Sequence, residues 1–275
     1  MTPDGDPAAA VARERDPHRP HRGVYLLPNA FTLGCLFCGF YAIVQAMNGN
    51  FGGAAVAIFI AMLLDTMDGR VARLTNTQSE FGAQFDSLAD MVSFGAAPAL
   101  IVYEWSLRGL GKLGWLAAFV YVAGAALRLA RFNTNIGVVD KRYFQGMPSP
   151  TAAALVAGLV WIATDWREQH LHELTAEDFK WVAWSLTLFA GVTMVSSAPY
   201  YSFKDLSLKK RVPFVFMIGI LAALVLISFD PPLVAFTVFL LYGISGWALW
   251  AWRLKTGKPL PWRMPPALSE DIDDH

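Results

Sequence analysis

Four aspartates stand close together in the stretch DTMDGRVARLTNTQSEFGAQFDSLAD, between segments that are otherwise strongly apolar. Asp65 and Asp68 are three residues apart and Asp86 and Asp90 are four apart, so on helices each pair projects from one face. Carboxylate oxygens are the ligands that hard divalent cations prefer, and without a cation the four negative charges would repel one another. The spacing therefore predicts a site for divalent cations.

Small residues and an arginine are interleaved with these acids. Gly69 and Ala72 follow the first two aspartates by one helical turn, and Gly82 precedes the third, so two backbones can approach each other and admit a flat ligand. Arg73, on the next turn, is placed to reach a phosphate. Together these residues predict a substrate with a pyrophosphate group, whose charge two cations about 3.5 to 4 Å apart can offset.

A purely structural role for the acids is the alternative. They could cap helix ends or pair with nearby arginines, which are Arg70, Arg73, Arg128 and Arg131. That explanation is reasonable for any single aspartate. Four at these spacings, interleaved with small residues, favour the cation site for the set.

The composition places this chemistry in a membrane. Of the 275 residues, 55% are hydrophobic and 16% are charged, and the mean hydropathy is +0.39, which is too apolar for a soluble domain of this length. The 22 basic and 22 acidic residues give a formal net charge of zero, so we expect no nucleic-acid partner.

About 20 apolar residues are needed to cross roughly 30 Å of hydrocarbon. The sequence has about eight candidate spans, near residues 26–47, 51–70, 84–104, 112–132, 148–164, 179–199, 212–229 and 231–252. We therefore expect an all-α, polytopic helical bundle.

Basic residues are retained on the cytoplasmic side of a membrane. Alternate loops and tails collect 18 of the 22 Lys and Arg residues on one side of these spans. This distribution predicts cytoplasmic termini, an even number of spans and an aspartate cluster that faces the cytoplasm. We also expect no cleaved signal peptide, a tail over residues 1–23, a transmembrane domain over 24–254 with its core at about 25–200, and a second tail over 255–275.

The acids and the residues between them follow the pattern Asp65-x2-Asp68-Gly69-x2-Ala72-Arg73-x8-Gly82-x3-Asp86-x3-Asp90. This pattern resembles the signature of the CDP-alcohol phosphatidyltransferase family, whose members transfer a phosphatidyl or similar group from a CDP-linked lipid to an alcohol and release CMP. The resemblance implies that Asp65, Asp68, Asp86 and Asp90 hold two divalent cations, Mg²⁺ or Mn²⁺. It also implies that Asp90 accepts the proton of the attacking hydroxyl.

The same resemblance assigns the CDP-lipid contacts. Gly69 and Arg73 would contact the cytidine and phosphates, with Ala72 packing beneath them, and Gly82 would be a further contact. Ser79 is similar in place to a hydroxyl residue that touches the nucleotide in this family. The stretch LPNAFTLGCLFCGFYA resembles the family's helix on the nucleotide side, which puts Asn29 and Thr32 near the CDP group.

The flanking stretches DSLADMVSFGAAPALIVYEW, RLARFN and FQGMPSPTAAAL resemble the membrane-spanning phosphatidylserine synthases within the family. This likeness implies CDP-diacylglycerol and L-serine as substrates, a bacterial inner membrane as the location and a homodimer. One departure is GCLFCG at residues 34–39, where such enzymes commonly have GNLFCG, and it leaves the four acids untouched.

Serine carries a carboxylate and an ammonium, so its pocket should supply a cation and acceptors. The candidates are Arg128, Arg131, Asn133 and Gln145. Arginines at a cytoplasmic helix end are also expected from topology alone. The loop over residues 133–148 is long enough to cover the site.

Two other functions remain open from the sequence. The acceptor could be glycerol phosphate or inositol phosphate, which a basic pocket would favour, and Lys141 and Arg142 add to the two arginines named above. A divalent-cation transporter is the alternative outside this family. Transporters usually place such acids near the membrane midplane within repeated elements, and no repeat of the cluster is seen.

Overall fold

The computed structural model describes residues 26–75, 79–134, 143–169, 175–202 and 214–256. The helical segments are α1 (Leu26–Met47), α2 (Phe51–Leu74), α3 (Glu80–Asp90), η3 (Met91–Ala96), α4 (Ala97–Trp105), η4 (Leu107–Leu110), α5 (Lys112–Thr134), α6 (Ser149–Gln169), α7 (Lys180–Val195), α8 (Phe214–Phe229) and α9 (Pro231–Thr256). The expected N-terminal tail, Lys141, Arg142 and nearly all of the expected C-terminal tail lie outside the described residues.

Each of the eight predicted apolar runs coincides with a helix over most of its length, and α3, η3 and α4 follow one another without a break to form the third run. The run predicted over residues 179–199 was too long, because α7 ends at Val195 and the chain enters β2 at Pro199. Within the described residues, five helices are long and apolar enough to cross a membrane, over Pro28–Met47, Phe51–Leu74, Glu80–Trp105, Lys112–Thr134 and Pro231–Thr256. The predicted class, a mostly helical membrane protein, is confirmed. The number of spans and the side on which the termini lie stay predictions.

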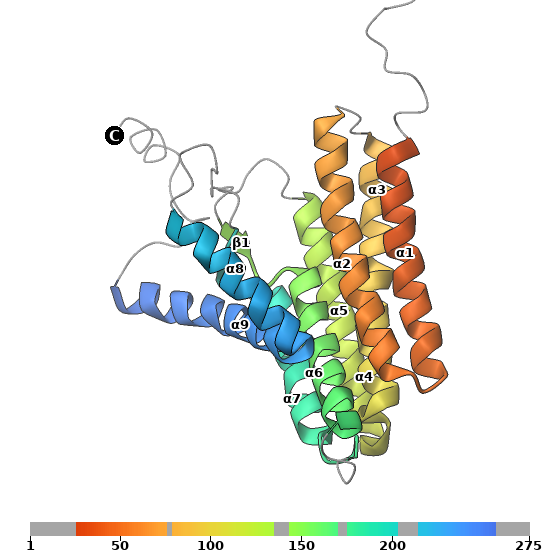
Figure 1. The fold of residues 1–275 in the computed structure, drawn as a ribbon. Helices are drawn as coiled ribbons and strands as arrows, with labels where there is room; N and C mark the ends of the chain where they lie inside the picture. Colours follow the sequence, from red (N-terminus) through yellow and green to blue (C-terminus); the bar gives the residue numbers. More distant parts are fainter. Residues whose placement is uncertain (1–25, 76–78, 135–142, 170–174, 203–213, 257–275) are drawn as a thin grey trace, which may run out of the picture.

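Helix α6 lies inside the bundle. It packs against α2, α4, α7 and α9, and residues 151–160 are buried on every face. Ala and Gly are frequent along it, so the neighbouring backbones can approach closely. Since protein surrounds α6, this helix needs less apolar surface than a helix at the outside of the bundle, such as α1 (Figure 1).

Helices α5 and α7 are in close contact at two glycines. A Cβ atom added to Gly191 would lie 2.9 Å from the Cα of Tyr121, and one added to Gly124 would overlap the carbonyl oxygen of Gly191. Glycine is therefore required at both positions for the two backbones to meet.

A π-helical segment directly follows Asp90. Pro98, one turn further on, has no N–H to donate to the carbonyl of Phe94, four residues before it. The hydroxyl of Tyr121 donates to this carbonyl instead, at 2.9 Å. Ser93 in the same segment donates to the carbonyl of Cys35 on α1, at 3.0 Å. These bonds fix the helix that carries Asp90 against α1 and α5.

A short antiparallel sheet was not predicted. Strand β1 (Tyr143–Gln145) pairs with β2 (Pro199–Tyr201), so the chain after α5 is joined to the chain after α7. The hydroxyl of Tyr200 donates to the carbonyl of Gly243 on α9, at 2.6 Å, and burial raises the pKa of this hydroxyl above its ordinary range. Tyr200 therefore remains a hydrogen-bond donor and attaches the sheet to α9.

Candidate metal and substrate site

The acids of α2 and α3 meet at one end of the bundle. Asp65, Asp68 and Asp86 each offer a carboxylate oxygen, and these oxygens lie within 4.8 Å of one another. Helix α1 packs against both α2 and α3 and so sets the spacing between them (Figure 1). Three of the four acids that the sequence predicted to form a cation site are therefore neighbours in the structure.

Asp90 lies beside this group, one turn beyond Asp86. Its side chain is close enough to Asp65 for the two to interact, and its buried Oδ1 atom has no hydrogen-bond partner among the described residues. A buried carboxylate oxygen without a partner is costly. A bound cation would satisfy it, so the donor set fits a hard divalent cation, whose preferred ligands are carboxylate oxygens.

Asp68 is the buried member of the set and is held by α1. The hydroxyl of Thr32 lies 2.9 Å from Oδ2 of Asp68 and 3.2 Å from the carbonyl oxygen of Pro28. Both Thr32 and Asp68 are buried. The sequence placed Thr32 near the CDP group, and the structure places its hydroxyl on a candidate metal ligand.

Among the described residues, no arginine forms an ion pair with the acids of the cluster. Between described residues, the ion pairs are Arg108–Glu104 and Lys180–Glu177. Neither involves the aspartate cluster. The purely structural explanation by ion pairing is therefore not supported.

Three of the predicted CDP-lipid contacts lie together where α1 meets α3. The hydroxyl of Ser79 accepts a hydrogen bond from the backbone N–H of Gly82, at 3.0 Å, and so caps α3. A Cβ atom on Gly82 would lie 3.4 Å from Oδ1 of Asn29. A side chain at position 82 would therefore crowd the side chains of Ser79 and Asn29.

On α2, the guanidinium group of Arg73 lies over Gly69. A Cβ atom on Gly69 would lie 3.6 Å from Nη1 of Arg73 on the same helix, and no other helix in the described part of the chain comes within 4 Å of it. Ala72 is half-buried one residue before this exposed arginine. A small residue and an exposed cation therefore stand side by side near the acids.

The predicted acceptor contacts divide into two groups. Arg128 is close to Asp90 and Asp65, and its Nη1 donates to the hydroxyl of Ser149, at 2.6 Å. Asn133 donates to the hydroxyl of Ser87, the neighbour of Asp86, at 3.0 Å. These two residues are joined to the acid cluster.

The other two contacts lie beside the end of α7. Arg131 donates to the carbonyl oxygens of Val195 and Ser196, at 2.6 and 3.3 Å, and so satisfies carbonyls that the end of the helix leaves without partners. Gln145 donates to the hydroxyl of Ser197, at 3.4 Å. Some of the N–H groups of Arg131 therefore stabilise the end of α7 and are not available to an acceptor substrate.

Sequence reasoning missed Ser149 and Tyr242. Ser149 begins α6 and is fully buried against Arg128, and Tyr242 on α9 lies close to the same arginine. A serine before a proline at a helix start is a weak signal for the first. Nothing in the local sequence marks Tyr242, because its role depends on how α9 packs.

The fold and the site together define a mostly helical membrane protein with a carboxylate cluster near one end of its bundle. Residues 25–196 match the family model described as CDP-alcohol phosphatidyltransferase, and the chain belongs to this family.

The chain is similar to several bacterial proteins named CDP-diacylglycerol–serine O-phosphatidyltransferase. It is 38% identical over 232 residues to the one from Helicobacter pylori, which covers 83% of this chain and 93% of that protein. The relative from Mycobacterium bovis is 35% identical over 196 residues, or 67% of this chain and 68% of the relative. The relative from Bacillus subtilis is 38% identical over 126 residues, or 46% of this chain and 70% of the relative.

Proposed function

We propose that this chain transfers the phosphatidyl group of CDP-diacylglycerol to the hydroxyl of L-serine and releases CMP. The observation that carries the proposal is the convergence of Asp65, Asp68 and Asp86 within 4.8 Å, with Asp90 beside them, in a member of this family. The names of the relatives support CDP-diacylglycerol and serine as the substrates.

Asp65, Asp68, Asp86 and Asp90 would hold the divalent cations, for which we propose two ions of Mg²⁺ or Mn²⁺. Bound there, these ions would offset the negative charge of the diphosphate. The partnerless Oδ1 of Asp90 and the three converging carboxylates support this assignment. The hydroxyl of Thr32 orients Asp68 within the set.

Asp90 serves as the general base in this proposal. The serine hydroxyl is a poor nucleophile until a positioned base takes its proton, and a carboxylate held beside the cations, as Asp90 would be, can take it. The serine oxygen forms a bond to the phosphorus of the phosphatidyl group as the bond from that phosphorus to the CMP oxygen breaks. The proton goes to Asp90, and CMP leaves with the electrons of the broken bond.

The CDP group would lie against α1, the end of α2 and the start of α3. Arg73 is exposed beside Gly69 and can reach a phosphate, and the junction of Asn29, Ser79 and Gly82 offers an amide and a hydroxyl. The proposed CDP-lipid contacts are Asn29, Thr32, Gly69, Ala72, Arg73, Ser79 and Gly82.

The acceptor would bind on the other side of the acids, next to Arg128. This arginine is the cation closest to Asp90 among the proposed acceptor contacts, so it can hold the serine carboxylate while the hydroxyl faces the base. Asn133 donates a hydrogen bond to Ser87 on α3 and would be a second polar contact for the serine substrate. Arg131 and Gln145 would contribute from the end of α7.

The finer features of the molecule are also proposals. We propose eight membrane spans, cytoplasmic termini, an active site that faces the cytoplasm of a bacterial inner membrane, and a homodimer. The division into a transmembrane domain over residues 24–254 and two tails belongs with them. The distribution of basic residues supports the orientation.

The test is to incubate purified protein with CDP-diacylglycerol, Mn²⁺ or Mg²⁺ and one acceptor at a time. We expect CMP release with L-serine and none with glycerol phosphate or inositol phosphate. Release with a phosphorylated polyol alone would replace serine as the acceptor. Cation flux in sealed vesicles without CMP release would favour a transporter.

A further inference from the structure

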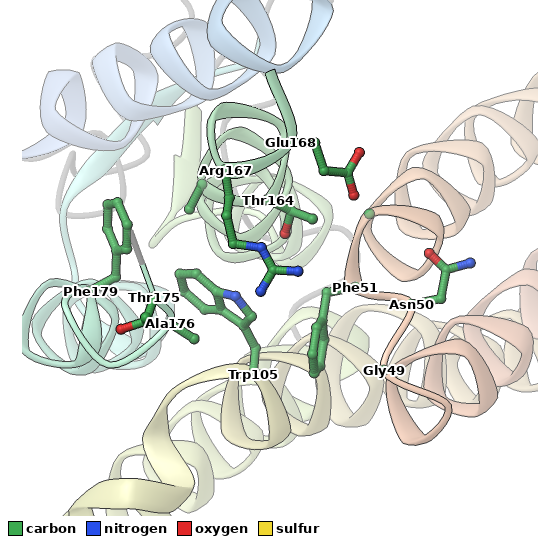
Figure 2. Close-up of a pocket in the computed structure, with 12 residues that line it drawn as sticks. Gly49, Asn50, Phe51, Trp105, Thr164, Arg167, Glu168, Thr175, Ala176 and Phe179 are labelled. Carbon is green, nitrogen blue, oxygen red and sulfur yellow. The ribbon is translucent and has the colours of Figure 1, made fainter. Parts of the chain in front are cut away.

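A polar cavity lies at the end of the bundle opposite the aspartates. It is lined by the turn between α1 and α2, the ends of α4 and α6, and the chain that leads into α7 (Figure 2). Phe51 in its wall begins α2, and Asp68 stands 17 residues further along the same helix. At a rise of 1.5 Å per residue the two sites are about 25 Å apart, so the cavity is separate from the proposed active site.

Two nitrogen donors face this cavity. Figure 2 shows the guanidinium group of Arg167 and the indole nitrogen of Trp105 toward its middle, from α6 and α4. Neither side chain takes part in the hydrogen bonds or ion pairs of the described residues. Trp105 is only 8% exposed and packs on Phe179, with ring centroids 5.9 Å apart. The indole N–H of a largely buried tryptophan usually has an acceptor, and the exposed guanidinium group of Arg167 lines the same cavity, so the pair points to a ligand.

The ligand that fits these donors is an oxyanion. A guanidinium group and an indole N–H both donate and neither accepts, and a charged donor favours a charged acceptor. The cavity holds about 80 Å³. A water molecule needs about 10 to 15 Å³ on this measure, so the space admits one phosphate group.

The cavity is also lined by a negative charge, which favours a ligand that carries both charges. Glu168 follows Arg167 directly and also lines the cavity, so the formal charge of the lining is balanced. A bare phosphate would meet the carboxylate of Glu168, whereas a group with both a phosphate and an ammonium would match both charges. Trp105 ends a helix that is long and apolar enough to span a membrane. Lipid headgroups lie at this level, where tryptophan side chains are enriched.

We propose that this cavity binds the headgroup of a zwitterionic phospholipid, with the phosphate on Arg167 and Trp105 and the ammonium near Glu168. The acyl chains would extend along the outside of the bundle, in the leaflet opposite to the one that faces the aspartates. The site would hold a structural lipid, and its occupancy is independent of the transferase reaction.

The experiment measures lipid retention by the full-length protein in neutral detergent, with native mass spectrometry as the readout. Phosphatidylethanolamine, phosphatidylglycerol and inorganic phosphate are the three probes, added separately. Arg167→Gln removes the charge, and Trp105→Phe removes the N–H while keeping an aromatic ring. Lys112→Gln is the control, because Lys112 is an exposed cation at the same end and does not line the cavity.

We expect wild-type protein and Lys112→Gln to retain phosphatidylethanolamine in preference to phosphatidylglycerol. Loss of a charge-assisted hydrogen bond should weaken retention by about tenfold or more in Arg167→Gln. Trp105→Phe should weaken the retention of phosphatidylethanolamine by a smaller factor. If Arg167→Gln does not fold, the Trp105→Phe variant alone tests whether the cavity binds the headgroup.

Equal retention of both lipids, or retention that neither variant changes, would overturn the proposal. Binding of inorganic phosphate without retention of either lipid would replace the phospholipid by a free anion. CMP release in detergent should be the same for Arg167→Gln and wild type, so a failure of this proposal is distinguishable from a failure of the proposed function.

Discussion

The hydroxyl of Thr32 on α1 lies 2.9 Å from a carboxylate oxygen of Asp68 on α2, and both residues are buried. This contact joins α1, the first helix of the region that matches the family model, to α2, which carries Asp65 and Asp68. A hydroxyl that donates to a ligand oxygen fixes the direction in which the carboxylate points. Residues in this position commonly change metal affinity by 10- to 100-fold when they are replaced.

Replacing Thr32 by Val keeps the shape of the side chain and removes the hydroxyl. We expect the Mn²⁺ concentration for half-maximal CMP release to rise by roughly tenfold, because Asp68 loses its orienting donor. Thr32→Ser retains the hydroxyl and serves as the control. An unchanged Mn²⁺ dependence in Thr32→Val would show that this hydroxyl does not support the cation site.

Asp90→Asn separates proton transfer from binding. The amide cannot accept the proton of the serine hydroxyl, so we expect CMP release to fall by at least about 100-fold while binding of CDP-diacylglycerol is largely kept. Asp68→Asn should instead weaken Mn²⁺ dependence and CDP-diacylglycerol binding together. Turnover by Asp90→Asn at a near-normal rate would exclude Asp90 as the base.

Arg128→Gln tests the acceptor side of the site. We expect the KM for serine to rise by about tenfold or more, because a charge-assisted hydrogen bond to the serine carboxylate is lost, while the affinity for CDP-diacylglycerol changes little. Ser149→Ala is the matched variant, since it removes the hydroxyl that accepts from Arg128 and leaves the charge in place. A serine KM that Arg128→Gln leaves unchanged would rule out the proposed contact.

The contact between α5 and α7 gives a prediction about stability. A methyl group on Gly124 would overlap the carbonyl of Gly191, so Gly124→Ala should destabilise the protein by about 1 to 3 kcal/mol. Gly219→Ala is the control, because no atom described in the structure lies within 4 Å of the added atom on α8 and Ala favours the helix. Thermal unfolding in detergent, followed by circular dichroism, measures both. Equal melting temperatures for the two variants would contradict the close contact.

Ionisation of Asp178 should contribute to the pH dependence of the free energy of unfolding. Hydrogen bonds from the backbone N–H and the hydroxyl of Thr175 lower the pKa of Asp178 below its ordinary value of 3.8. A lowered pKa in the folded state means that the contribution is present above about pH 4 and is lost as the pH falls through the folded-state value. We therefore expect Asp178→Asn to melt below wild type at pH 7 and the difference to shrink as the pH falls below about 4. A difference that does not shrink on acidification would exclude ionisation as its cause.

Much of the helical arrangement could be predicted from the sequence. The length of the apolar stretches identified eight segments that are largely helical in the structure. The spacing of the acids identified Asp65, Asp68 and Asp86 as neighbours. Both signals are local, because a helix repeats every 3.6 residues and its period can be read in a single stretch. The family pattern then supplied the chemistry that spacing alone leaves open.

Contacts between distant segments could not be predicted. The strands β1 and β2 are three residues each, too short to leave a pattern, and they pair only because α5 and α7 end side by side. Arg131 was expected to bind the acceptor, yet it also holds two carbonyl groups at the end of α7. The sequence gives no sign of that partner, because the contact depends on how the two helices pack.

Anomalous diffraction from crystals grown with Mn²⁺ and CDP-diacylglycerol would locate the cations directly. We expect anomalous peaks among the carboxylates of Asp65, Asp68, Asp86 and Asp90, in contact with the diphosphate. A diphosphate bound elsewhere, with no Mn²⁺ among these carboxylates in protein that still releases CMP, would contradict this expectation.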